Sequence, residues 1–237
     1  TLIDETSPSR VLAPVDDDLA DEWLTRNFDD TSWISGFSRV GYDLDTEFQA
    51  WIQTDVQAAM YLNTTSVYIR IPFDMTEVHS LESLTLSMRY DDAFVAFLNG
   101  VEVARSATAP QGDDLTWETA AGILREDSEA VQLEDYDISQ HIGLLQNGHN
   151  VLALHGLNFI VENRDLLIAP QLSIQRRQSY YQNWLNRFAV SEAEGSLLDD
   201  PDGDGFSNLQ EYALGGTPNR SDRNTELLPR FDTSEEG

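Results

Sequence analysis

The stretch FVAFLNGVEVAR, Phe94–Arg105, predicts a β-hairpin. Two apolar-rich runs flank Asn99-Gly100, and this pair favours a type I′ turn because both central residues of that turn need a positive φ. The hairpin therefore supplies two neighbouring antiparallel strands, and the rest of the fold can be predicted outward from it.

Four further segments have the composition and spacing of strands. Two of them alternate apolar and polar residues, which is the period of a half-buried strand, and another follows a second Asn-Gly turn at Asn147-Gly148. The four segments are Val67–Phe73, Leu84–Tyr90, Asn150–Leu157 and Leu166–Ile174. Short strands separated by long polar loops favour a mainly β, antiparallel β-sandwich over alternating βαβ units.

The pattern changes after residue 176. Apolar residues at helical spacing predict a helix from Ser179 to about Ala193, with Ser179 as its N-cap. A shorter helix is predicted from Asn208 to Leu214, where Gly215-Gly216 ends it.

Between these helices, Asp200–Glu211 has the pattern of a twelve-residue calcium loop. Ca²⁺ takes six to eight oxygen ligands, which alternating Asp side chains, a backbone carbonyl and a bidentate Glu can supply. The expected ligands are Asp200, Asp202, Asp204, the carbonyl of Phe206, Asn208 and Glu211. Only one such loop is present, so the ion is expected to be structural rather than regulatory.

Composition restricts the classes of partner. The chain of 237 residues has 42 acidic and 14 basic residues, a formal net charge of −28, and no cysteine. This charge disfavours nucleic acid and anionic membranes, and the absence of cysteine excludes disulfides and thiolate chemistry. No apolar run is long enough to insert into a membrane. We expect a piece of a longer protein, secreted or at the cell surface.

Several phrases together resemble a known bacterial module. They are FDDTSW at 28–33, SVYIR at 66–70, YDDAFVAFLNGVEVAR at 90–105 and GHNVLALHGLN at 148–158. These resemble galactose-binding-like jelly-roll domains of large secreted bacterial proteins, which accompany polysaccharide-degrading enzymes. DPDGDG at 200–205 and NLQEYALGG at 208–216 resemble the bacterial thrombospondin type-3-like calcium segment, and one half of an EF-hand.

The resemblance implies three regions. Residues 1–176 would form the jelly-roll domain, residues 177–218 the EF-hand-like calcium segment, and residues 219–237 a linker.

A carbohydrate-binding domain stacks sugars on exposed aromatic rings and binds the hydroxyls with polar side chains. Trp51 and Trp117 lie in polar, loop-like stretches and are candidate platforms, although a loop Trp can equally cover the core. Asn158 and Arg164 are candidate hydroxyl partners. The nearby His155 follows an apolar strand and is expected to be a hydrogen-bonded core residue.

The function predicted from these features is non-catalytic binding of a polysaccharide near a catalytic neighbour, by a monomeric module. No nucleophile motif, His-Glu-x-x-His or phosphate loop is present. Two alternatives remain open: a protein-protein or spacer module of a surface protein, and a polysaccharide hydrolase or lyase.

Overall fold

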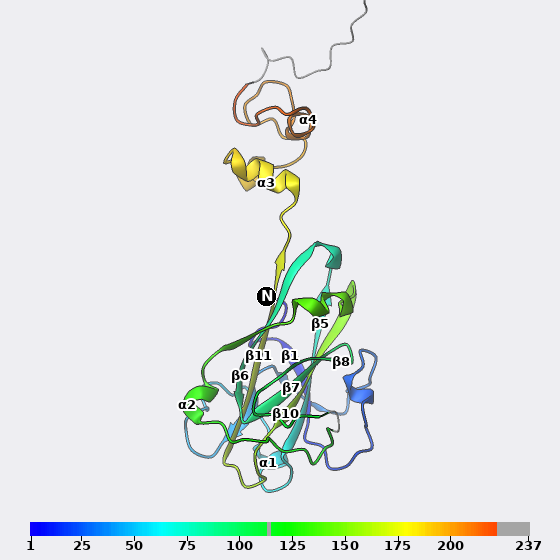
Figure 1. Cartoon of the computed structure of the whole chain (residues 1–237), viewed down its shortest axis with the longest axis vertical. Helices are drawn as coiled ribbons and strands as arrows, with labels where there is room; N and C mark the ends of the chain where they lie inside the picture. The colour runs from blue at the N-terminus through cyan, green and yellow to red at the C-terminus, as the bar shows by residue number, and fades with distance from the viewer. Residues whose placement is uncertain (113–114, 222–237) are drawn as a thin grey trace, which may run out of the picture. The chain divides into compact units, whose positions relative to one another are not determined.

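The computed structural model describes residues 1–112 and 115–221. The chain divides into two compact units, Thr1–Arg176 and the residues from Arg177 onward (Figure 1). Most of the predicted linker, residues 222–237, lies outside the described residues.

The first unit is a β-sandwich of two sheets. The six-stranded sheet has the order β2 (Ile34–Phe37), β1 (Pro8–Leu12), β5 (Ser66–Met75), β10 (Gly148–Leu157), β7 (Ala93–Leu98) and β8 (Val101–Arg105). The five-stranded sheet has the order β4 (Thr54–Asp55), β3 (Val40–Asp43), β11 (Asp165–Arg176), β6 (Leu81–Asp91) and β9 (Glu134–Asp137). Every pairing is antiparallel except that of β3 with β4. The predicted fold class, a mainly β antiparallel sandwich, is confirmed.

The predicted hairpin is formed by β7 and β8. Asn99 and Gly100 have φ angles of 53° and 95°, as a type I′ turn requires. Residues Val95 and Arg105 pair near the far end of the hairpin, and a register shift lies between Ala96 and Phe97.

The main core lies between the two sheets and is built by alternation along the strands. Val67, Ile69 and Ile71 of β5 are fully buried in it, as are Leu84 and Leu86 of β6. Successive side chains of a strand point to opposite faces, so the intervening residues of β5 lie on the other face of the six-stranded sheet. That face carries the candidate site described below.

Five strands were absent from the sequence prediction: β1, β2, β3, β4 and β9. They have two to five residues each. In β9, the sequence EDYD has no apolar alternation, and its position is fixed by pairing with β6 at the edge of the sheet. Short segments of this kind depend on neighbouring strands rather than on their own pattern.

Short helical segments connect the strands of the sandwich. They are η1 (Glu22–Leu24), α1 (Gln57–Met60), η2 (Val78–Ser80), α2 (Asp127–Ala130) and η3 (Ser139–Leu144). Among the described residues, no helix combines the length and the apolar character needed to cross a membrane.

The second unit contains α3 (Tyr180–Arg187), η4 (Glu192–Glu194) and α4 (Asn208–Leu214). Ser179 caps α3 as predicted, because its Oγ accepts a hydrogen bond from the N–H of Gln182 (3.0 Å). The prediction that α3 reaches Ala193 was wrong. Ala189 has a φ of 55°, and the N–H of Val190 donates to the carbonyl of Leu185 (3.1 Å). A left-handed residue of this kind ends a helix.

Candidate functional site

The outer face of the six-stranded sheet is covered by two loops. Segment 13–33 supplies Trp23, Leu24 and Trp33, and the described parts of a second loop, 106–112 and 115–122, supply Ala109 and Ala121. They pack against outward-facing side chains of the central strands, namely Tyr68, Ala93, Val95, Phe97, Ala153 and Leu157. This second apolar cluster holds the two loops against the sheet and leaves a pocket between them.

A buried arginine fixes the first covering loop in place. The side chain of Arg70 on β5 is 2% exposed and forms an ion pair with Asp30 (2.7 Å). It also donates hydrogen bonds to the carbonyls of Trp23 and Thr25 (2.9 Å for Thr25). A guanidinium can satisfy several acceptors at once, so Arg70 positions the Trp23 segment directly over the sheet.

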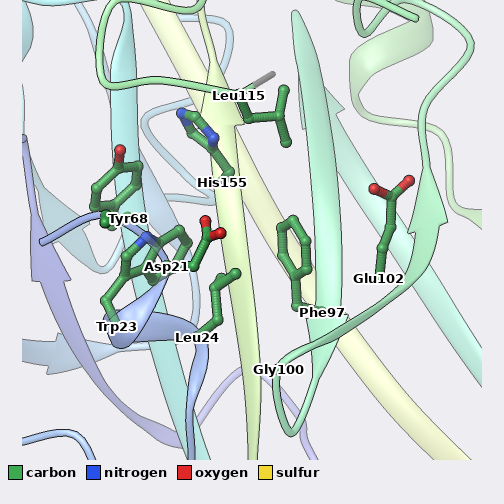
Figure 2. Close-up of a pocket in the computed structure, with 10 residues that line it drawn as sticks. Asp21, Trp23, Leu24, Tyr68, Phe97, Gly100, Glu102, Leu115 and His155 are labelled. Atoms are coloured by element: carbon green, nitrogen blue, oxygen red, sulfur yellow. The ribbon is translucent and has the colours of Figure 1, made fainter. Parts of the chain in front are cut away.

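We call the space between the loops the sheet-face pocket; its volume is about 190 Å³. Figure 2 shows Tyr68, Phe97 and His155 on the strands, Asp21, Trp23 and Leu24 on one side, and Leu115 on the other. A neighbouring pocket of about 430 Å³ is also lined by Ala20, Asp21, Tyr68 and Leu115, and adds Asp16, Asp17, Leu19 and Thr116. The two pockets therefore adjoin along Tyr68 and Asp21.

Two polar groups at this pocket have no partner within the described part of the chain. Tyr68 is 6% exposed and stacks on Trp23, with ring centroids 4.1 Å apart and planes 9° from parallel. Among the described residues neither the Tyr68 hydroxyl nor the Trp23 indole N–H forms a hydrogen bond. Burial, with a further contribution from Asp17 and Asp21, raises the pKa of Tyr68 to about 12. The hydroxyl is therefore a neutral donor at physiological pH.

His155 has the buried, hydrogen-bonded environment expected from the sequence. It is 2% exposed, and its Nε2 lies 2.8 Å from the hydroxyl of Ser66. Burial, together with the charge of Arg105, lowers the pKa of His155 to about 3. Its imidazole is therefore neutral. The sequence prediction missed that the ring also lines a pocket, because its strand context alone indicates burial.

The acidic residues at the pocket differ in their partners. Glu102 forms two hydrogen bonds with the guanidinium of Arg105 (2.9 and 2.8 Å), and Arg105 also donates to the carbonyl of Pro110. The carboxylates of Asp17 and Asp21 have no cationic partner among the described residues. No arginine or histidine other than His155 lines either pocket within the described chain.

The four predicted carbohydrate residues have different surroundings in the structure. Trp51 is partly buried beside the Phe48 cluster, and the guanidinium groups of Arg39 and Arg89 lie 5.2 and 4.4 Å from its ring centre. Trp117 is partly exposed and follows Thr116 of the second covering loop. Neither tryptophan lines a pocket among those found in the described chain.

The two predicted hydroxyl partners form hydrogen bonds within the protein, although the Oδ1 of Asn158 has no partner among the described residues. Asn158 is fully buried, and its Nδ2 donates to the hydroxyl of Tyr42 (2.8 Å). A sugar on the surface therefore cannot reach it. Arg164 is exposed and forms two hydrogen bonds with Asp45 (2.8 and 2.9 Å). Both residues lie in the connection that joins β10 and β11.

The Asp91-Asp92 pair is buried and belongs to the structure of the sandwich. Asp92 accepts hydrogen bonds from the N–H of Arg125 (2.9 Å), the N–H of Phe159 (2.8 Å) and Nδ2 of Asn163 (2.9 Å). It thereby joins two loops to the end of β6. Burial and the neighbouring carboxylates raise the pKa of Asp91 to about 9.

The candidate metal centre is in the second unit. Carboxylate oxygens of Asp200, Asp202 and Asp204 lie within 4.8 Å of one another. Gly205, with a φ of 95°, allows the turn there, and its N–H donates to Asp200 (2.9 Å). The chain thus gathers three carboxylates of like charge in one turn.

The other expected ligands follow directly. Asn208 and Glu211 are fully buried at the start of α4. The Nδ2 of Asn208 donates to the carbonyls of Glu194 (2.7 Å) and Ser196 (2.9 Å), while its Oδ1 has no hydrogen-bond partner. The buried Oδ2 of Asp202 has none either. Oxygen-only donors with unpartnered buried atoms fit a hard cation. The N–H of Phe206 donates to Asp204 (2.8 Å).

This segment differs from an EF-hand in the helix before the loop. Alpha-helix α3 ends at Arg187, and η4 lies between it and Asp200. Only α4 adjoins the loop, where Ser207 and Gln210 form a capping box.

Comparisons with known proteins give no family assignment. No protein-family model matches the chain, and no curated protein matches it. A β-glycosidase from Bacteroides vulgatus is 13% identical, with a TM-score of 0.40 over 74% of this chain and 20% of that one. Bacteroides uniformis β-glucuronidase 2, covalently bound to cyclophellitol-6-carboxylate aziridine, is 14% identical, with a TM-score of 0.40 over 71% of this chain and 17% of that one. The chain spans about a fifth of the length of these proteins.

Proposed function

We propose that this chain is a carbohydrate-binding β-sandwich module that holds a sugar in the sheet-face pocket. The observation that carries the proposal is Tyr68, a residue that is only 6% exposed and lines the pocket, and whose hydroxyl forms no hydrogen bond within the described chain. A ligand hydroxyl can accept from this otherwise unused donor, and a neutral hydrogen bond of this kind contributes roughly 0.5–1.5 kcal/mol. The indole N–H of Trp23 offers a second donor beside it.

The rest of the pocket suits a saccharide. Apolar surface from Phe97, Leu115 and Leu24 lies next to the carboxylates of Asp21 and Asp17. Sugars present apolar C–H faces and hydroxyl groups on the same ring, so they use both kinds of surface. Apolar lining with a few convergent polar groups is the usual composition of a small-molecule site.

The protonation states at the pocket favour binding over catalysis. A general acid or base works best with a pKa near the operating pH. The pKa of His155 is lowered to about 3 and that of Tyr68 is raised to about 12, so neither exchanges a proton readily near neutrality. Glu102 is held by Arg105. The proposed role is therefore to keep a polysaccharide close to a neighbouring catalytic domain and raise its effective concentration.

The substitution Tyr68→Phe tests the proposal. It removes only a hydroxyl that the fold does not use, so the melting temperature should stay unchanged. Affinity for the recognised glycan, measured by calorimetry after a panel of polysaccharides, should fall about two- to tenfold, the range for one neutral hydrogen bond. Tyr61→Phe is the matched control, since Tyr61 lies outside the pocket. Equal losses in both variants would reject this pocket, and no binding to any glycan would reject the function.

We propose further that the second unit holds one structural Ca²⁺. Asp200, Asp202, Asp204, the Phe206 carbonyl, Asn208 and Glu211 would hold it. The ion would neutralise carboxylates that otherwise repel one another and so allow the segment to fold. Titration of the metal-free chain with Ca²⁺, followed by calorimetry, should give one bound Ca²⁺ per chain. The double variant Asp202→Asn/Asp204→Asn should abolish this binding. Use of calcium in place of disulfides also suits a secreted or cell-surface protein.

Protein-protein contact is a second candidate function, and one surface favours it. Three loops of the sandwich are joined by hydrogen bonds: Asp92 accepts from the N–H groups of Arg125 and Phe159, and the N–H of Leu62 donates to the carbonyl of Val161. These loops carry five exposed apolar side chains: Leu62, Ile123, Leu124, Phe159 and Ile160. Exposed apolar patches often mark interaction sites. Sedimentation over a range of concentrations tests self-association through this surface, which Leu124→Asp with Ile160→Asp should remove. A monomer at every concentration would leave no support for a second copy as the partner.

A further inference from the structure

We propose that the sheet-face pocket recognises a sugar that carries an ammonium group, such as a 2-amino sugar, and rejects uronic acids and sulfated sugars. The inference rests on the proposed carbohydrate function and adds the chemical class of the ligand. It is carried by the charges around a pocket that already contains an unpartnered hydroxyl on a residue only 6% exposed, Tyr68.

The negative charge at the pocket is local, and two of its carboxylates have no ion pair within the described chain. Asp21 lines both adjoining pockets, and Asp16 and Asp17 line the larger one. Within the described chain, Asp17 and Asp21 have no ion pair. The only acidic residue here with a basic partner is Glu102, which Arg105 holds. A ligand cation is therefore the natural partner for Asp17 and Asp21.

The field of these carboxylates reaches the buried part of the pocket. Asp17 and Asp21 both act on the Tyr68 hydroxyl and, after burial, are the next contributors to its raised pKa. The same negative potential would favour an ammonium group and oppose a carboxylate or sulfate at that position. His155 supplies no positive charge, because burial keeps it neutral.

The lining side chains and the carboxylates would contact different parts of the ligand. Tyr68 is 6% exposed, and its hydroxyl, which has no acceptor in the described chain, can donate to a ring hydroxyl. The apolar side chains of Phe97 and Leu115 can contact the C–H face of the ring. Asp17 and Asp21 then select between ligands of different charge at the pocket mouth.

The test compares three soluble oligosaccharides of equal length in calcium-containing buffer: glucosamine, N-acetylglucosamine and galacturonic acid oligomers. Calorimetry should show the tightest binding for the glucosamine oligomer, weaker binding for its acetylated form and none for the uronate. The preference should weaken as pH rises and the amine loses its proton, and as salt screens the charges.

The double variant Asp17→Asn/Asp21→Asn should reduce the preference by on the order of two- to fivefold per carboxylate. Asp18→Asn is the matched control, because Asp18 lies on the same loop and lines neither pocket. An equal effect of both variants, or equally strong binding of spermidine, would mean that only the overall charge of the protein attracts cations, and the inference would be wrong.

Two other outcomes separate this inference from the function beneath it. If the neutral or the uronate oligomer binds best and Tyr68→Phe weakens that binding, the module binds sugars but the ammonium selectivity is wrong. If none of these oligomers and no glycan of the wider panel binds, the carbohydrate function fails, and the selectivity fails with it.

Discussion

The β-sandwich and the C-terminal unit bury different chemical groups. In the sandwich, aliphatic and aromatic side chains from every long strand fill a continuous core between two sheets. In the described part of the C-terminal unit, Leu185 is the only buried apolar side chain apart from Pro218, whereas Asp204, Asn208 and Glu211 are all buried. The sandwich therefore buries mainly apolar side chains, whereas the C-terminal unit buries mainly side chains with oxygen atoms.

This difference indicates that the two units are stabilised by different kinds of interaction. In the sandwich, the buried carboxylate of Asp92 is held by the protein itself, through three hydrogen bonds from its loops. In the C-terminal unit, Trp184 and Tyr181 of α3 contact Tyr212 of α4, with ring centroids 5.6 and 5.4 Å apart. These few contacts must oppose the repulsion of three clustered carboxylates. We therefore expect the sandwich to fold on its own core and the C-terminal unit to depend on a cation.

Calcium removal should produce the largest difference in behaviour between the two units. With EDTA, protease cleavage should become rapid within residues 177–221, because the clustered carboxylates lose their counter-ion. The sandwich should keep its melting temperature. Limited proteolysis with mass spectrometry measures both. A chain with Asp202→Asn and Asp204→Asn serves as the control and should no longer respond to EDTA. Equal cleavage with and without the chelator would contradict the proposed dependence on calcium.

A core substitution should destabilise the sandwich, and this effect should not depend on calcium. Leu154 on β10 is fully buried in the main core, and Leu154→Ala should lower the free energy of unfolding of the sandwich by roughly 2–5 kcal/mol. Urea denaturation measures this loss, which should be the same in calcium and in EDTA. Leu62→Ala, at an exposed position, should change stability by less than about 0.5 kcal/mol.

The pH dependence of stability should identify the buried acids of the sandwich. The folded pKa of Asp91 is raised to about 9 and that of Asp165 to about 6, in both cases chiefly by burial and then by neighbouring carboxylates that include Asp92 and Asp127. A raised pKa means that the folded state holds the proton more tightly. The resulting stability is complete below about pH 4 and is lost as pH rises through the folded pKa.

Urea midpoints at pH 5, 7 and 9 test this expectation. Stability of the sandwich should decline across the series, and Asp91→Asn should flatten the decline because the amide does not titrate. Asp18→Asn, at an exposed loop position, should leave the slope unchanged. If the stability of Asp91→Asn declined with pH as steeply as that of the native chain, Asp91 would not be the group responsible for the decline.

The smallest expected effect concerns a helix cap. Ser179→Ala removes the acceptor for the N–H of Gln182 and should destabilise the C-terminal unit by about 1 kcal/mol in the presence of calcium. Fluorescence of Trp184 during thermal unfolding can follow this unit. The same substitution at Ser191 is the comparison, because its Oγ donates to the carboxylate of Glu194 (2.8 Å) but accepts no backbone N–H at η4. A larger loss at Ser191 would contradict the role of the Ser179 cap.

Long strands and helix starts could be predicted because their signals are local. The positive φ of Asn99 and Gly100 follows from the residue types alone, and the alternation in β5 and β6 identifies which residues face the core. The short strand β9 could not be predicted, since only its pairing with β6 makes it a strand.

The candidate sugar site was not predictable in the same way. Trp51 and Trp117 were selected because polar neighbours suggested exposure, yet Trp51 lies beside two guanidinium groups and Asn158 is enclosed with Tyr42. The residues that line the sheet-face pocket and the adjoining pocket are spread over segments 16–24, 68, 97–102, 115–116 and 155. No spacing in the sequence relates them, because the pairing of β5, β10 and β7 brings them together.

The sequence by itself determined the β-sandwich class, the turn at Asn99-Gly100 and the carboxylate pattern of the calcium loop. Each depends on interactions between residues a few positions apart, which a local pattern records. Only the tertiary structure decided that Tyr68 and Trp23 meet beneath two loops and leave unpartnered polar groups in a pocket. Burial and the absence of a partner depend on every segment that packs around a group, so no local pattern can specify them.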